Sequence, residues 1–162
     1  MMKKLLLLVG LVMIFSLVAK AQGNLTNLKS VDIDVIRNVT KDNKCSLLIS
    51  KEEFFNEIEF IINTSQIKYE PYSLPSLVFE YTLHASFIGS NIQNCYFNGS
   101  LFLLDYSDDY KTSYDSSSSV HIVIWNDTTW GSGPANYEFK DAVLNTTSSL
   151  VKRFVNEWSR AN

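Results

Sequence analysis

The sequence contains few of the residues on which stapled, metal-bound or low-complexity proteins depend. Only two Cys, three Pro and six Gly occur among 162 residues. Two Cys are too few for a disulfide-built scaffold or for a zinc site of four thiolates, and so little Gly and Pro excludes a collagen-like or low-complexity chain. The formal net charge is −3 and the pI is about 5.3. We therefore expect no nucleic-acid partner, because such a partner selects a strongly basic surface.

Motifs for common catalytic chemistry are missing as well. The sequence has no His-Glu-x-x-His, Gly-x-Ser-x-Gly, P-loop or Gly-x-Gly-x-x-Gly pattern, and these mark zinc proteases, serine hydrolases, nucleoside triphosphatases and dinucleotide-binding enzymes. We therefore predict no cofactor, no catalytic residue and no metal site from motifs. What remains is a globular composition, with 46% apolar and 19% charged residues.

The N-terminus has the layout of an export signal. Lys3-Lys4 precedes an apolar run of about 14 residues, and Ala19 and Ala21 place small side chains where a signal peptidase reads them. The run is shorter than the ~20 residues needed to span a bilayer. We predict that residues 1–21 are a cleaved signal peptide. Residues 22–162 are then a single exported domain, periplasmic or secreted, with no transmembrane segment.

Alternation and helical spacing of apolar residues predict the elements of the remaining chain. The capping box Ser50-x-x-Glu53 begins the best supported helix, and apolar residues recur behind it at helical spacing. The predicted strands are 31–35, a short one near 67–69, 77–87, 93–104 and 120–125, and the predicted helices are 51–62 and about 136–160. The third and fourth of these strands are expected to pair as an antiparallel hairpin. This order predicts an α+β fold, with a mostly antiparallel sheet of four to five strands and two helices packed on one face.

Two polar segments, 105–119 and 126–134, are predicted as loops that carry aromatic residues which core packing does not explain. Recognition residues are often found on loops held by a rigid scaffold, and aromatic side chains bury a large contact area when a partner arrives. We predict that an unknown protein or small ligand binds to Tyr106, Tyr110, Tyr114 and Trp130. The alternatives are a solvated or weakly calcium-binding acidic loop at 105–119, and a Trp130 buried over the sheet edge.

The two cysteines lie far apart in sequence. Cys45 precedes the first predicted helix, and Cys95 lies on the apolar side of the predicted hairpin. After export to an oxidising compartment, two thiols in a small domain are expected to pair. The alternative, a nucleophilic Cys, needs a basic or His-containing neighbourhood, which the flanking sequence does not supply. We therefore predict a Cys45–Cys95 disulfide.

The only two histidines, His84 and His121, both fall on the polar side of predicted strands. If those strands are neighbours, the two side chains and Glu80 form a candidate metal site, because zinc sites combine imidazole and carboxylate ligands. The alternative is that both are ordinary histidines on the surface of the sheet.

The end of the predicted terminal helix carries a Phe-x-Asn-x-aromatic-x-x-x-Asn pattern, made by the residues Phe154, Asn156, Trp158 and Asn162. Together with Cys45 before the first helix and Cys95 in a mid-chain strand, this pattern resembles small exported bacterial proteins of unassigned function. The resemblance implies an exported α+β domain and supplies no activity.

These observations predict an exported, non-catalytic binding or envelope-accessory protein of unknown ligand. One alternative is a small metal-dependent hydrolase that uses His84, His121 and Glu80. Another is a secreted host-directed factor.

Overall fold

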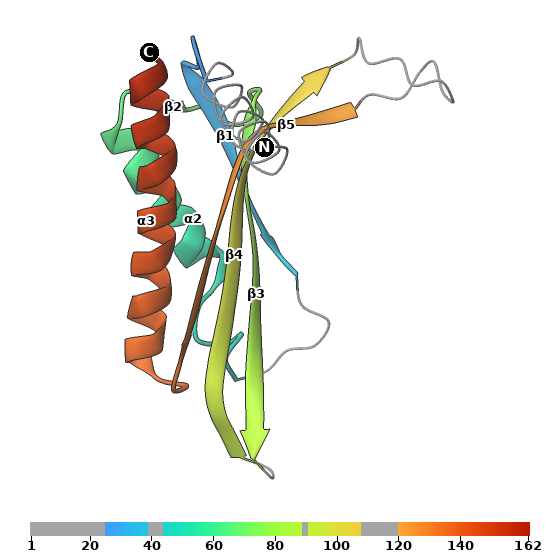
Figure 1. The fold of residues 1–162 in the computed structure, drawn as a ribbon, viewed down its shortest axis with the longest axis vertical. Helices are drawn as coiled ribbons and strands as arrows, with labels where there is room; N and C mark the ends of the chain where they lie inside the picture. Colours follow the sequence, from blue (N-terminus) through green and yellow to red (C-terminus); the bar gives the residue numbers. More distant parts are fainter. Residues whose placement is uncertain (1–24, 39–43, 89–90, 108–119) are drawn as a thin grey trace, which may run out of the picture.

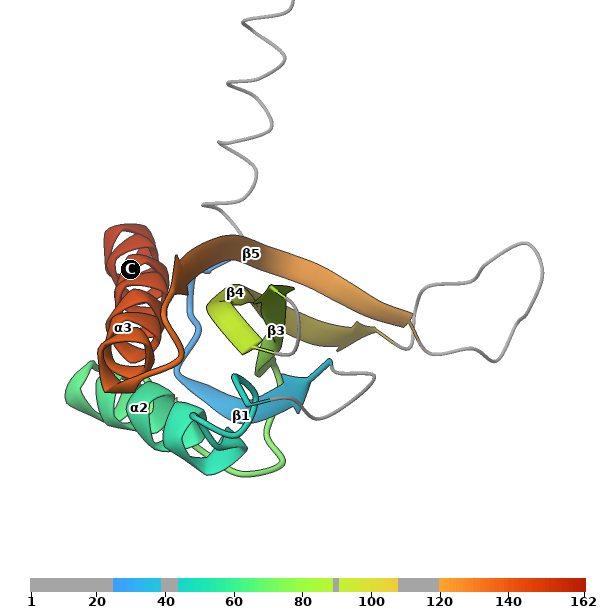
Figure 2. The ribbon, with the colours of Figure 1, turned by 90° about the horizontal axis from the view of Figure 1, so that it is seen from below.

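The computed structural model describes residues 25–38, 44–88, 91–107 and 120–162. In these residues one mixed sheet is covered on one side by two helices, which lie next to each other (Figures 1 and 2). The elements are, in chain order, β1 (Ser30–Arg37), α2 (Lys51–Thr64), β2 (Lys68–Tyr69), β3 (Ser76–Ile88), β4 (Asn91–Ser107), β5 (Val120–Gly133) and α3 (Tyr137–Ala161). The predicted α+β class, with both helices on one face, is confirmed.

Helix α2 begins where the capping box predicts. The Ser50 hydroxyl accepts a hydrogen bond from the Glu53 backbone N–H, and the Glu53 carboxylate accepts one from the Ser50 backbone N–H. These two bonds satisfy N–H groups that the first turn of a helix leaves without partners. The helix buries Phe54, Ile58 and Ile62 against the sheet.

Helix α3 is continuous through a segment with low helix propensity. Hydroxyl groups in this segment each donate to the backbone carbonyl four residues earlier, from Thr146, Thr147 and Ser149. These bonds give the hydroxyl groups partners within the helix, on carbonyl groups that can also accept the backbone ladder. Neither helix in the described part of the chain is both long enough and apolar enough to cross a membrane.

The sheet has the strand order β2-β1-β3-β4-β5. The predicted hairpin is confirmed, because β3 is antiparallel to β4 over the whole length of β3, and β5 continues the antiparallel pairing. β1 lies parallel to both β2 and β3. A parallel pair needs a crossover connection, and α2 supplies it between β1 and β2.

Two predicted loops are partly strand. β4 continues to Ser107, and β5 continues through the predicted loop 126–134 as far as Gly133, so Trp130 lies in a strand. Each residue from Asn126 to Gly133 has a partner on β4, for example Trp130 opposite Asn98. The loop prediction failed because Asn, Asp, Ser and Gly disfavour strands only weakly when a long neighbouring strand pairs with their backbone.

The core between the sheet and the helices is built around an aromatic cluster. The Phe54 ring of α2 lies 4.4 Å from that of Tyr81, 5.2 Å from that of Phe79 and 6.0 Å from that of Phe97. Gly99 of β4 makes room for these rings, since a Cβ there would lie 2.7 Å from Phe97.

Candidate functional site

Two hydrogen bonds on the helix-covered side of the sheet are structural. The Trp125 indole N–H donates to the Glu157 carboxylate of α3 at 2.7 Å, and the Ser148 hydroxyl donates to Glu57 of α2. Such bonds hold the two helices to each other and to β5.

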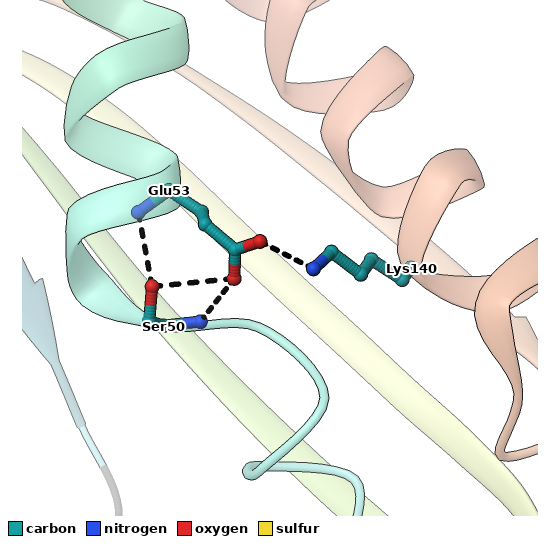
Figure 3. A network of polar contacts seen from close by, with 3 residues as sticks. All are labelled: Ser50, Glu53 and Lys140. Atoms are coloured by element: carbon teal, nitrogen blue, oxygen red, sulfur yellow. Dashed lines mark hydrogen bonds and ion pairs between the residues drawn. The ribbon is translucent and has the colours of Figure 1, made fainter.

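The most connected of these contacts joins Ser50, Glu53 and Lys140. Figure 3 shows the Glu53 carboxylate between the Ser50 end of α2 and the Lys140 ammonium of α3, to which it is ion-paired. The hydrogen bond from Lys140 and that from the Ser50 backbone lower the pKa of Glu53. The hydrogen bond to Glu53 in turn raises the pKa of Lys140. Because the partners of Glu53 are a helix cap and a neighbouring helix, its role is structural.

The predicted Cys45–Cys95 disulfide is confirmed. The two Cα atoms are 5.5 Å apart and both residues are buried. The bond fixes the segment before α2 to β4. Since neither cysteine is free, a nucleophilic thiol is ruled out for the oxidised protein.

The structure separates the two histidines. His84 on β3 is paired with Tyr96 of β4, whereas His121 on β5 is paired with Tyr106. These two tyrosines are ten residues apart on β4, which is roughly 33 Å at the rise of a strand. No group of three or more His, Cys, Asp or Glu in the described part of the chain could hold a metal ion. The hydrolase site postulated from His84, His121 and Glu80 does not form.

The structure does not bring the predicted aromatic binding residues together in its described part. Trp130 is on β5 and 76% exposed, so the alternative of a buried Trp130 is wrong. Tyr106 lies in β4, eight residues from the partner of Trp130, or roughly 27 Å along the strand. Tyr110 and Tyr114 lie outside the described residues. Binding through these four residues remains a prediction.

The terminal motif is structural. The Trp158 indole N–H donates to the Leu28 carbonyl at 2.8 Å, and the Asn162 side chain bonds to the backbone of Asn27 and Leu25. Phe154 is buried against Trp125. The motif therefore fastens the end of α3 to residues 25–28, just before β1.

The side of the sheet opposite the helices, here called the open face, carries exposed aromatic residues. Trp130 lies opposite Asn98, and Tyr96 lies opposite Ser132, the next residue of β5 on the same face. Such diagonal neighbours are close enough for aromatic side chains to form one surface. Tyr96, which is 42% exposed, was missed by sequence reasoning, although its position between the inward-facing Cys95 and Phe97 indicates that it points outward.

A groove of about 600 Å³ lies on the same open face, between β1, β3 and the segment after β2. This volume is within the range of small-molecule sites. The groove is lined by three groups of side chains, namely the apolar Ile36, Val78 and Leu104, the wall of Tyr69, Pro71, Tyr72 and Leu74, and the carboxylates of Asp32, Asp34 and Glu80. The groove was not predicted from the sequence, because its residues come from four separate segments.

Comparisons with known proteins give a weak resemblance. No protein-family model matches the chain, and no curated protein matches its sequence. A PelC dodecamer from Paraburkholderia phytofirmans aligns over 81% of this chain and 86% of its own, with 8% identity and a TM-score of 0.41. The hypothetical protein CT253 from Chlamydia trachomatis aligns over 82% and 94%, with 10% identity and a TM-score of 0.37. A minor lipoprotein from Acinetobacter baumannii aligns over 80% and 89%, with 6% identity and a TM-score of 0.30. We draw no functional conclusion from similarities of this size.

Proposed function

We propose that this chain is an extracytoplasmic, non-catalytic binding protein that binds its partner on the open face of the sheet. The observation that carries the proposal is the contrast between the two faces. Both helices pack on one face (Figure 2). The other face exposes Tyr96 and Trp130 and contains the groove. Exposed aromatic residues and concavities are both typical of binding surfaces.

Two features support a location outside the cytoplasm. The Cys45–Cys95 bond is of the kind that persists in oxidising compartments. Residues 1–21 have the charged start, apolar run and small-residue site of an export signal. Periplasmic and secreted locations both fit, and so does an accessory role in a cell envelope.

The experiment that tests the proposal places a photo-cross-linking amino acid at single positions and irradiates cells of the native host. We expect adducts from positions 96 and 130 on the open face. Tyr137 at the start of α3 is the matched control, since it is an aromatic residue that is 82% exposed elsewhere. Adducts from position 137 alone, or in equal yield from all three positions, would reject the open face as the binding surface.

A further inference from the structure

The groove on the open face has an aromatic and apolar wall. Tyr69 is held in place by an edge-on contact with Phe55 of α2, at 5.7 Å between ring centroids. Tyr72 is 97% exposed at the rim of the groove, and Leu74 is exposed beside it. Val78 forms part of the floor and is only 7% exposed. The apolar part of a ligand can therefore pack against these side chains.

The charge of the groove has one sign. Asp32 and Asp34 lie two residues apart on β1, and Glu80 lies on β3 opposite Ile36. None of the lining residues described is Lys or Arg. Lys51 approaches Asp34 at 3.6 Å, but both side chains are more than half exposed, so this ion pair is weak.

The environment of Tyr69 is consistent with this negative charge. Burial raises the pKa of the Tyr69 hydroxyl, and the nearby charges of Asp32 and Glu59 raise it further. The Tyr69 phenol is neutral at physiological pH.

The carboxylates are spread along the groove. In the strand pairing, Asp34 is opposite Val78 and Glu80 is opposite Ile36, so neighbouring carboxylates are separated by roughly two residue positions, or about 7 Å. No metal-binding cluster is formed by them or by other side chains in the described ranges. A compact metal ion would contact one carboxylate at a time, whereas an extended organic cation can use an ammonium group and an apolar body together.

We propose that the groove between β1, β3 and residues 69–74 binds an organic ammonium ion with an apolar or aromatic body. The inference rests on the proposed function, because the groove belongs to the open face. The ammonium group pairs with one carboxylate at a time in the row of Asp32, Asp34 and Glu80, and the apolar body packs on Tyr69, Tyr72 and Leu74. Ion pairing and the cation–π attraction then select an amine over a neutral or acidic molecule of the same shape.

The test titrates the mature protein with three phenyl compounds of nearly equal size and follows backbone amide NMR shifts. Phenethylammonium chloride is the probe, phenethyl alcohol is its neutral counterpart and hydrocinnamate is its anionic counterpart. We expect the ammonium compound to shift the amides of Tyr69, Tyr72 and Leu74 and to bind about tenfold more tightly than the alcohol. The anion should bind least, and added salt should reduce the difference.

Paired variants locate the selectivity. The double variant Asp34→Asn/Glu80→Gln keeps the shape of both side chains and should remove most of the preference for the ammonium compound. Asp141→Asn is a control that removes an exposed carboxylate of α3, away from the groove, and the preference should persist. An unchanged urea midpoint in both variants establishes that they fold.

Several results would overturn the inference. They are equal affinity for the ammonium compound and the alcohol, no shift of the groove amides, an unchanged preference in the double variant, or equal shifts of these amides by calcium chloride. Binding of all three probes in the groove without selectivity would reject the preference for an ammonium ion, but it would not contradict the proposed function. Failure of cross-linking at positions 96 and 130 would reject the proposed function whatever the titration shows.

Discussion

Phe54 is the residue through which α2 is fixed to the sheet. It is fully buried, and its ring contacts three rings from β3 and β4. The rings of Phe79 and Phe97 close over Gly99, where an added Cβ would lie 3.0 Å from Phe79 and 2.7 Å from Phe97. Glycine is needed here because a methyl group would displace ring atoms that have little space to move.

Gly99→Ala is expected to destabilise the protein by about 1–3 kcal/mol, the usual cost of overpacking a filled core. Gly131→Ala is the matched control, because an added Cβ at Gly131 of β5 meets nothing within 4 Å. That variant should be neutral or slightly more stable, since alanine has less conformational freedom in the unfolded chain. Urea unfolding of the two variants measures the difference, and equal effects at both sites would contradict the packing argument.

Glu53 makes stability depend on pH. Its pKa is lowered in the folded protein, chiefly by the hydrogen bond from Lys140, so the unfolded chain takes up the proton first as the pH falls. The stabilisation is fully present above the unfolded pKa of about 4.3. It is lost as the pH falls through the folded pKa, which lies lower.

Glu53→Gln should therefore lower the urea midpoint at neutral pH, and the difference from the unaltered protein should shrink towards pH 3. Glu52→Gln, in the same turn but exposed, should show a smaller effect at neutral pH. The side chains of Glu53 and Lys140 are partly exposed, so solvent screening keeps the destabilisation by Glu53→Gln modest. A difference that does not change with pH would show that Glu53 acts without its charge.

At the scale of the elements, backbone groups that lack a neighbouring strand are protected in the same way on β1 and on β5. The Asp32 carboxylate accepts a hydrogen bond from the Ile33 N–H on β1, just beyond the end of β2. On β5, the Asp127 carboxylate accepts from the Thr128 N–H at 2.7 Å, and Arg153 donates both to Asp127 and to the Thr128 carbonyl. Edge strands with free N–H and C=O groups are prone to pair with other chains, and these side chains occupy such groups.

Asp127→Ala is expected to increase self-association, because it frees the Thr128 N–H and leaves Arg153 without its carboxylate partner. The loss in stability should be small, at most about 1 kcal/mol for a partly exposed ion pair. Size-exclusion chromatography with light scattering, over a range of concentrations, compares this variant with Asp141→Ala, which removes an exposed carboxylate of α3. Identical masses for the two variants would rule out the edge-protecting role.

Local signals predicted the elements that rest on local physics. The capping box at Ser50, the stripe of α3 and the alternation of the β3–β4 hairpin were all correctly located. Features that depend on pairing between distant segments were not predicted, namely the extension of β5 to Gly133 and the parallel placement of β1. The candidate site shows the same limit, because Tyr96 and the groove exist only once the strands are assembled.

At the scale of the whole molecule, we expect export to an oxidising compartment to allow the Cys45–Cys95 bond to form. We expect processing between Ala21 and Gln22, because Ala19 and Ala21 occupy the positions read by a signal peptidase. Intact mass of the protein from the extracytoplasmic fraction should show the loss of residues 1–21. A product that retains them would contradict processing at this site.

The disulfide joins residues 50 positions apart, so the loop it closes contains α2, β2 and β3. The chain-entropy estimate for a loop of this length is about 4 kcal/mol, and removal of a native disulfide costs about 2–5 kcal/mol. Cys45→Ala/Cys95→Ala should lower the free energy of unfolding by that amount and make it insensitive to reductant, whereas reduction should destabilise the unaltered protein. Because Tyr96 and Trp130 remain on paired strands, cross-linking at positions 96 and 130 should persist in the variant at temperatures where it is folded. Loss of cross-linking by a folded variant would mean that the disulfide shapes the binding surface itself.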